Sequence, residues 1–152
     1  MLVIVINGVG IPARIIPPFF ADRFGPLNVI LPMSFCICLV TWCWLAVGTV
    51  SGLYVFAVFC GLAQAGFQCI FPATMASITS RLDMAGTRLG MAFSLISVAA
   101  LTGPPIGGAI QRANGGSFVG SQIFAAVLTL FTFALVLTAR VVKGGWSWRS
   151  KC

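Results

Sequence analysis

Three polar side chains stand within long apolar stretches and are the residues best suited to chemistry. Arg14 carries a permanent positive charge, and Gln64 and Gln68 lie four positions apart, which places both amides on one face of a helix. A guanidinium binds carboxylates through paired hydrogen bonds, while an amide both donates and accepts them. These residue types favour the recognition of a polar or anionic small molecule.

Each of these residues also has a structural interpretation. Arg14 either meets an anionic substrate or lies at a membrane boundary, where its long side chain reaches the lipid headgroups. Gln64 and Gln68 either line a cavity or join helices through hydrogen bonds. Phe67 and Phe71 lie beside the two amides and could stack on a substrate. Weaker candidates, whose polar groups often bond their own backbone, are Asn7, Ser94 and Ser97.

The groups that most enzymes use are missing from this sequence. It has no histidine and no glutamate, and its two carboxylates, Asp22 and Asp83, lie between apolar runs. Five of the six cysteines lie inside such runs and are interpreted as small buried hydrophobic residues: Cys36, Cys38, Cys43, Cys60 and Cys69. We therefore expect no enzyme activity, no metal site and no cofactor.

The composition excludes a water-soluble domain. Apolar residues make up 59% of the 152 residues and charged residues only 7%, against about 25% charged in a soluble domain. No charged residue occurs between Arg23 and Arg81, a stretch nearly three times the ~20 residues that cross a bilayer once. The net charge of +7 comes from basic residues at the ends of apolar runs, so it indicates a lipid bilayer rather than nucleic acid as the partner.

Five apolar runs are predicted to span the bilayer, which defines an all-α, polytopic transmembrane helix bundle. The runs are continuously apolar rather than alternating, and this favours helices over a β-barrel. The first run contains Arg14 and three prolines, so it is either kinked or ends near Arg14. The predicted spans are residues 2–20, 27–47, 53–78, 89–110 and 118–138, followed by a tail over residues 139–152.

Basic residues between the spans predict the orientation in the membrane. One side has only Arg112, whereas the other has Arg23, Arg81, Arg88, Arg140, Lys143, Arg149 and Lys151. Because positive charge gathers on the cytoplasmic side, we expect a cytoplasmic C-terminus in a plasma membrane or another cellular membrane.

Small residues and prolines predict local features of the third and fourth spans. Two sets have the spacing of close helix packing: Gly61, Ala65 and Gly66, and then Gly103, Gly107 and Gly108. Pro104 and Pro105 remove two backbone donors and are expected to bend or break the fourth helix. Such a break either lines a substrate route or is purely structural.

Two segments resemble the major facilitator superfamily of membrane transporters. The segment from Asn7 to Gly25 resembles the signature around a cytoplasmic loop, which matches at Arg14 and at residues 21–25, Ala-Asp-Arg-x-Gly. Residues 86–94, Gly-Thr-Arg-Leu-Gly-Met-Ala-Phe-Ser, and residues 101–109 look like the penultimate helix of fungal monocarboxylate-transporter-like members.

The resemblance implies that the five spans are helices eight to twelve of a secondary transporter for a small organic solute, such as a monocarboxylate or related metabolite. It also implies a conformational latch formed by Asp22, Arg23 and Gly25 with Arg81 or Arg88. The alternative for these residues is an ordinary solvated turn. We expect the chain to be incomplete by itself, so that N-terminal helices or a partner chain are needed. The alternative functions are a small structural or assembly membrane protein and a non-functional transporter remnant.

Overall fold

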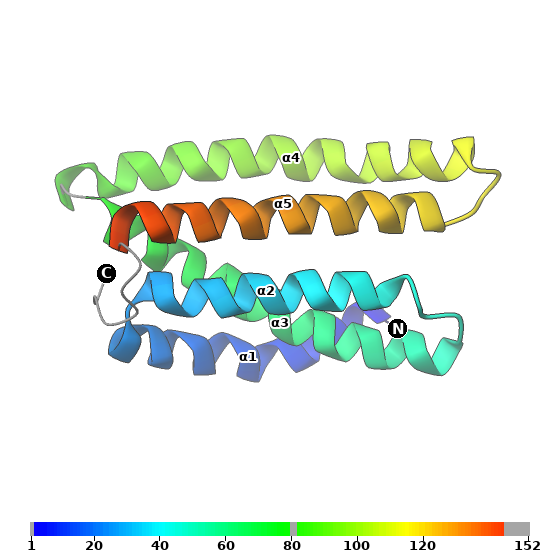
Figure 1. Ribbon diagram of the computed structural model, residues 1–152, viewed down its shortest axis with the longest axis horizontal. Coiled ribbons are helices and arrows are strands. Elements are labelled where there is room, and N and C mark those ends of the chain that lie inside the picture. The colour runs from blue at the N-terminus through cyan, green and yellow to red at the C-terminus, as the bar shows by residue number, and fades with distance from the viewer. Residues whose placement is uncertain (1, 80–81, 145–152) are drawn as a thin grey trace.

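The computed structural model describes residues 2–79 and 82–144, which form an all-helical bundle without strands. The predicted all-α helix bundle is therefore confirmed (Figure 1). A short 3-10 turn, η1 (Leu82–Met84), precedes the fourth helix. The long helices are α1 (Leu2–Phe24), α2 (Pro26–Trp44), α3 (Val50–Ile78), α4 (Ala85–Ala113) and α5 (Val119–Gly144).

All five long helices are long and apolar enough to cross a membrane. Their outward faces expose large hydrophobic side chains, such as Ile4, Phe35, Leu101 and Phe131, as expected for surfaces that contact lipid rather than water. Cys36 and Cys43 are also exposed, which corrects the interpretation of these two thiols as buried residues. An apolar run in a membrane protein need not face the core, because the lipid is itself apolar.

Figure 1 shows the ends of the helices gathered at two ends of the bundle. We call them the Gly25 end, which holds residue 25, η1 and the last turn of α5, and the Gly115 end, which holds residues 45–49 and 114–118. Gly25 adopts a positive φ of 91°, which explains a glycine at this turn, and Pro26 follows in the first turn of α2, where its missing N–H is not needed.

Helix α1 does not end near Arg14. It continues through Pro17 and Pro18 to Phe24, so Asp22 and Arg23 lie in its last turn rather than in a loop. Apolar patterning locates the spans, whereas a helix continues into the polar residues that flank a span, which accounts for the greater length of α1, α3, α4 and α5. Helix α2 instead ends at Trp44, three residues before the predicted end at residue 47.

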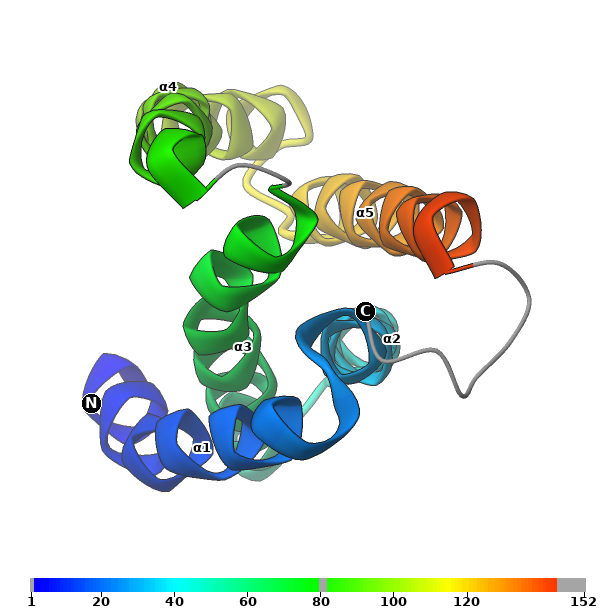
Figure 2. The same ribbon diagram turned by 90° about the vertical axis from the view of Figure 1, so that its left-hand side faces the viewer.

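Helix α3 is the centre of the packing. It contacts α1 and α2 most extensively, and α2 in turn contacts α5 (Figure 2). At the Gly25 end a small core forms around Ile70, which is fully buried, with Ala21, Val29 and Ile30 packed around it. The core thus joins α1, α2 and α3, and Val136 of α5 packs against it.

The first predicted small-residue face is confirmed. Gly61 lies so close to α1 that a methyl group on its Cα would be 2.7 Å from the Ile6 carbonyl oxygen. Gly66 contacts Pro17, and Ala65 is buried against Gly10. The second predicted face is not used in this way, because a methyl group on Gly103, Gly107 or Gly108 would meet open space. No residue of α4 is buried, since this helix makes only sparse contacts with α3 and α5.

The double proline does not break α4. The helix is continuous from Ala85 to Ala113 with Pro104 and Pro105 inside it, so the predicted break at Gly103, Pro104, Pro105 and Gly107 is wrong. Gly103 has no Cβ to clash with the ring of the following proline, which eases the helical conformation at this position. The Ser121 hydroxyl of α5 also donates to the Gly107 carbonyl oxygen at 2.9 Å, and so supports the backbone one turn further on.

Candidate functional site

Helices α1 and α3 run parallel, because their contacts advance together along both chains. Ile6 lies against Gly61, Gly10 against Ala65, and Pro17 against Gly66. Arg14 follows Gly10 by four positions, which turns its side chain about 40° to one side of the contact. Gln64 and Gln68 follow Gly61 and Ala65 by three positions, which turns them about 60° in the opposite sense.

When two parallel helices face each other, side chains that are offset from the contact in opposite senses on the two helices lie at the same edge of that contact. Arg14, Gln64 and Gln68 therefore share one edge of the α1–α3 pair, at similar depth along the bundle. All three side chains are exposed, and none has a hydrogen-bond partner among the residues that the structure describes. We call this group the polar edge. It can present one guanidinium and two amides to a bound molecule.

Aromatic side chains lie along the same helix as the two amides. Phe71 contacts Phe93 of α4 edge-on, with ring centroids 6.3 Å apart, and so connects α3 to α4 next to the polar edge. Phe67 is half-buried and packs against the core around Ile70. The structure thus places Phe67 in the core packing and Phe71 at the α3–α4 contact.

The weaker polar candidates are bonded within their own helices. Ser97 lies on the exposed α4 and its hydroxyl donates to the Ser94 carbonyl oxygen at 2.8 Å. The Ser94 hydroxyl donates to the Gly90 carbonyl oxygen, and the Asn7 amide donates to the Val3 carbonyl oxygen. In the described residues the Ser97 hydroxyl bonds only its own helix, so no hydrogen bond joins it to the polar edge.

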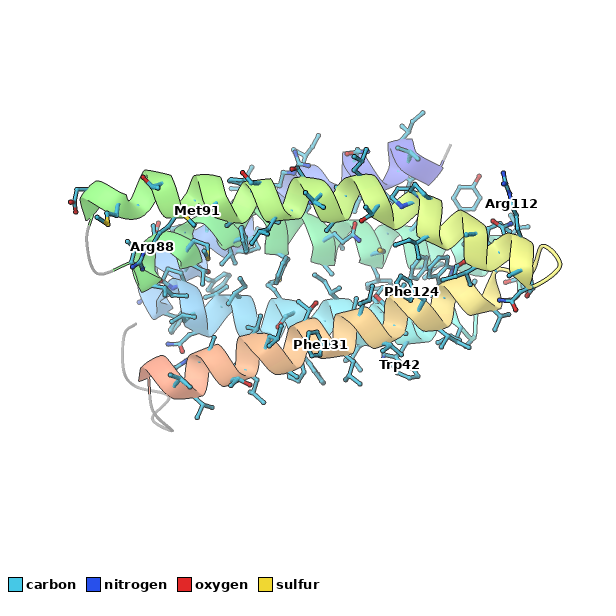
Figure 3. All side chains as sticks on the ribbon, turned by 90° about the horizontal axis from the view of Figure 1, so that it is seen from above. Trp42, Arg88, Met91, Arg112, Phe124 and Phe131 are labelled. Atoms are coloured by element: carbon cyan, nitrogen blue, oxygen red, sulfur yellow. The ribbon has the colours of Figure 1, made fainter. Side chains whose placement is uncertain are left out.

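The predicted latch residues lie at the Gly25 end. Asp22, Arg23 and Arg88 are exposed, and within residues 2–79 and 82–144 no ion pair joins Asp22 to an arginine. Arg81 lies outside the described residues. Figure 3 shows Arg88 at one end of α4 and Arg112 at the other, so the two arginines lie on opposite sides of the bundle.

One polar contact at the Gly25 end was not predicted from the sequence. Arg140 of α5 is only 8% exposed, and its Nε donates to the Asn28 side-chain oxygen at 2.6 Å. The Asn28 nitrogen donates in turn to the Phe24 carbonyl oxygen at 2.8 Å. The sequence predicts only a topology signal at Arg140, whereas the packing of α5 on α2 gives it a second, structural contact.

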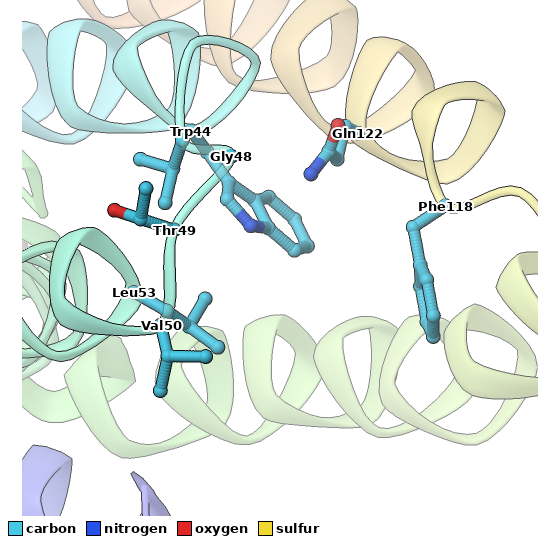
Figure 4. A pocket seen from close by; sticks show the side chains of 8 residues that line it. Trp44, Gly48, Thr49, Val50, Leu53, Phe118 and Gln122 are labelled. Atoms are coloured by element: carbon cyan, nitrogen blue, oxygen red, sulfur yellow. The ribbon is translucent and has the colours of Figure 1, made fainter.

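A cavity of about 520 Å³ opens at the Gly115 end, between α2, α3 and α5. In Figure 4 the Trp44 ring and Gln122 point into the same space, with Phe118 on its far side. The cavity walls are mostly apolar, and Gln122 and Thr49 provide the polar groups; Val47, Val50 and Leu53 complete the apolar lining. None of these residues was predicted from the sequence, because apolar side chains at span ends look like any other part of a membrane helix.

The described residues contain no group of three metal-ligating side chains. No protein-family model matches the sequence, and no solved structure matches it. Curated proteins from fungi do match. Over 140 residues the chain is 36% identical to an MFS-type transporter of Gibberella zeae, a match that covers 92% of this chain and 32% of that protein.

Two further fungal relatives match the chain in the same way. It is 33% identical over 142 residues to the aspyridones efflux protein of Emericella nidulans, covering 93% of this chain and 29% of that protein. It is 35% identical over 147 residues to an MFS transporter of Aspergillus flavus, a match that covers 95% of this chain and 33% of that protein. The chain thus spans about a third of the length of these relatives. Over most of its length the chain is thus similar to fungal MFS-type transporters, and its five long helices are each long and apolar enough to cross a membrane.

Proposed function

We propose that this chain forms part of a secondary transporter that moves a small organic solute across a membrane. The observation that carries the proposal is the polar edge, where Arg14, Gln64 and Gln68 converge on two parallel apolar helices without partners among the described residues. Polar groups at membrane depth are expensive unless they face a cavity or a ligand. The homology to MFS-type transporters gives the same class of function independently.

The proposed solute carries an anionic group, with a monocarboxylate or related metabolite as the substrate class. Arg14 offers the paired donors that fit a carboxylate, and the two amides accept or donate to further polar groups of the solute. One relative is named for the efflux of aspyridones, which supports export of an organic metabolite as one direction of transport. In this proposal the C-terminus faces the cytoplasm.

We further propose that the five helices work together with others. The relatives are about three times as long as the matched segment, and α4 has no buried residue in this bundle. Helices of the same polypeptide or of a partner chain would cover α4 and close the route beside the polar edge. Without them the polar edge opens directly to lipid, and no route encloses the solute.

The test is an uptake assay with matched proteins in vesicles. One sample contains this chain alone, and the second contains the chain with the additional helices of a matching relative; labelled monocarboxylates are supplied outside. We expect uptake only in the second sample, and we expect Arg14→Ala to weaken it. Uptake by the chain alone would contradict the requirement for further helices. Assembly into membranes without transport by either sample would instead support a structural or remnant role.

A further inference from the structure

The last turns of α5 hold a buried arginine at the Gly25 end. Arg140 has 8% of its surface exposed, whereas Arg23 and Arg88 at the same end are exposed. A buried guanidinium is stable only when hydrogen bonds replace the lost water. Its position near the C-terminus of α5 is favourable, because the carbonyl groups there carry partial negative charge.

The hydrogen bonds of Arg140 define a connection across three helices. Its Nε donates to Asn28 Oδ1 at 2.6 Å, across 112 positions of sequence. Asn28 lies in the first turn of α2, and its Nδ2 donates to the Phe24 carbonyl oxygen in the last turn of α1. The bond to Phe24 fixes the orientation of the Asn28 amide, so its oxygen is aimed at Arg140.

This connection surrounds the turn between α1 and α2. The Asn28 backbone N–H donates to the Gly25 carbonyl oxygen at 3.2 Å, and the Gly25 N–H donates to the Ala21 carbonyl oxygen at 2.8 Å. Asn28 therefore bonds both the end of α1 and the turn itself, and Arg140 adds a side-chain hydrogen bond from α5 to α2. We call Phe24, Asn28 and Arg140 the clasp.

We propose that Arg140 is a positioning residue that holds the α1–α2 turn against α5 through Asn28. The clasp keeps the last turn of α1, which carries Asp22 and Arg23, in one place relative to α5. Its role in turnover rests on the proposed transport function, because a transporter must rearrange helix ends between its conformations. Its role in joining the helices does not depend on transport.

The first experiment is a double-mutant cycle on the complete chain in lipid nanodiscs. The rate of thermal unfolding, followed by circular dichroism, is compared for three variants: Asn28→Ala, Arg140→Ala and the double variant. We expect each single variant to unfold about tenfold faster and the double variant to match the worse single variant, since hydrogen-bonded neighbours are not additive. Arg23→Ala and Arg88→Ala are the controls, with changes under about twofold expected. Additive effects of the two single variants would overturn the clasp.

A second set of variants separates the hydrogen bond from general folding. If Arg140→Ala fails to fold, Arg140→Met replaces it in the cycle, because its long apolar side chain fills similar space but cannot donate to Asn28. Asn28→Asp combined with Arg140→Lys is expected to recover at least half of the stability, because a carboxylate pairs with an ammonium group. No recovery in this pair, with additive single variants, would reject the assignment of Arg140 to Asn28.

The third readout is transport by the chain together with its additional helices. We expect Asn28→Ala to change the maximal rate about threefold or more with KM unchanged, because the clasp lies away from the polar edge and affects only the exchange between conformations. Coupling in stability without transport in any sample would refute the proposed function and leave the clasp intact. Transport with normal kinetics and no coupling would refute the clasp alone.

Discussion

A guanidinium in an apolar helix can bind a solute only if no protein group already occupies its hydrogen-bond donors. Arg14 lies about 15 Å before the end of α1, measured along the helix axis, and its side chain is exposed on the edge that it shares with Gln64 and Gln68. Substitution at this position therefore tests binding rather than folding, because no described contact depends on the side chain.

We predict that Arg14→Ala raises the KM for an anionic solute about tenfold or more, since a hydrogen bond to a charged group contributes ~1.5–3 kcal/mol. The KM of Arg14→Lys should lie between those of the unchanged protein and Arg14→Ala, because lysine keeps the charge but loses the paired geometry. Uptake kinetics in vesicles measure this effect, with Arg112→Ala at the opposite end of the bundle as the control. An unchanged KM in both Arg14 variants would assign Arg14 to the membrane boundary.

The latch is predicted to act on the rate of transport. Asp22 has no ion pair among the described residues, and we propose that a latch through this carboxylate closes in another conformation. We expect Asp22→Asn to lower the maximal rate two- to fivefold, the size of a charge interaction near a helix end, with KM unchanged. Asp83→Asn is the matched control, and equal effects of the two substitutions would remove Asp22 from the mechanism.

Arg14 and Arg140 show what the sequence reveals about single residues and what it does not. An arginine inside an apolar run is visible without any structure, because its cost in the membrane demands an explanation. Arg140 follows the last span, where basic residues are ordinary. Its bond to Asn28 depends on the packing of α5 against α2, which no local pattern encodes.

At the scale of the helices, the close contact of α1 and α3 is the most sensitive feature. A methyl group at Gly61 would lie 2.7 Å from the Ile6 carbonyl oxygen and 3.0 Å from the Ile6 Cα, and neither atom can move away without shifting a helix. The register of the polar edge depends on the same contact, since Gly61 and Ala65 set where Gln64 and Gln68 lie.

We predict that Gly61→Ala destabilises the bundle by ~1–3 kcal/mol, the range for overpacked contacts. Gly90→Ala on α4 is the matched control, since nothing lies within 4 Å of the added methyl group, and alanine there should stabilise the helix by up to ~1 kcal/mol. Thermal unfolding in detergent, followed by circular dichroism, measures both. Similar midpoints for the two variants would contradict the close α1–α3 contact.

The helices were predictable because each is a long apolar run. The close packing at the small residues of α3 was predictable because small side chains let membrane helices approach closely. The ends of the helices and the continuity of α4 were not. A proline is a strong signal for a helix boundary in water, whereas helices in lipid retain it more easily because neighbouring groups satisfy the freed carbonyls. The carbonyls that Pro104 and Pro105 leave without a helical donor are those of Ala100 and Leu101, four residues earlier in α4.

At the scale of the whole molecule, the distribution of charge predicts orientation. In a background with all six cysteines replaced by alanine, Ser117→Cys and Asp83→Cys place single thiols at the Gly115 end and the Gly25 end. We expect a membrane-impermeant maleimide to label the first in intact cells and the second only after permeabilisation, because the basic Gly25 end should face the cytoplasm. The reverse pattern would invert the proposed topology.

The absence of buried residues in α4 has a consequence for sequence variation. Helix α4 contacts α3 and α5 without burying any residue. A helix mostly in lipid tolerates many exchanges among apolar residues, whereas a helix enclosed by protein restricts the size of nearly every side chain. Saturation mutagenesis of the 29 positions of α4 should therefore give two different landscapes. In this chain alone the landscape is permissive; in an assembly that covers α4, one stripe of positions becomes intolerant and marks the side of α4 that the neighbour contacts.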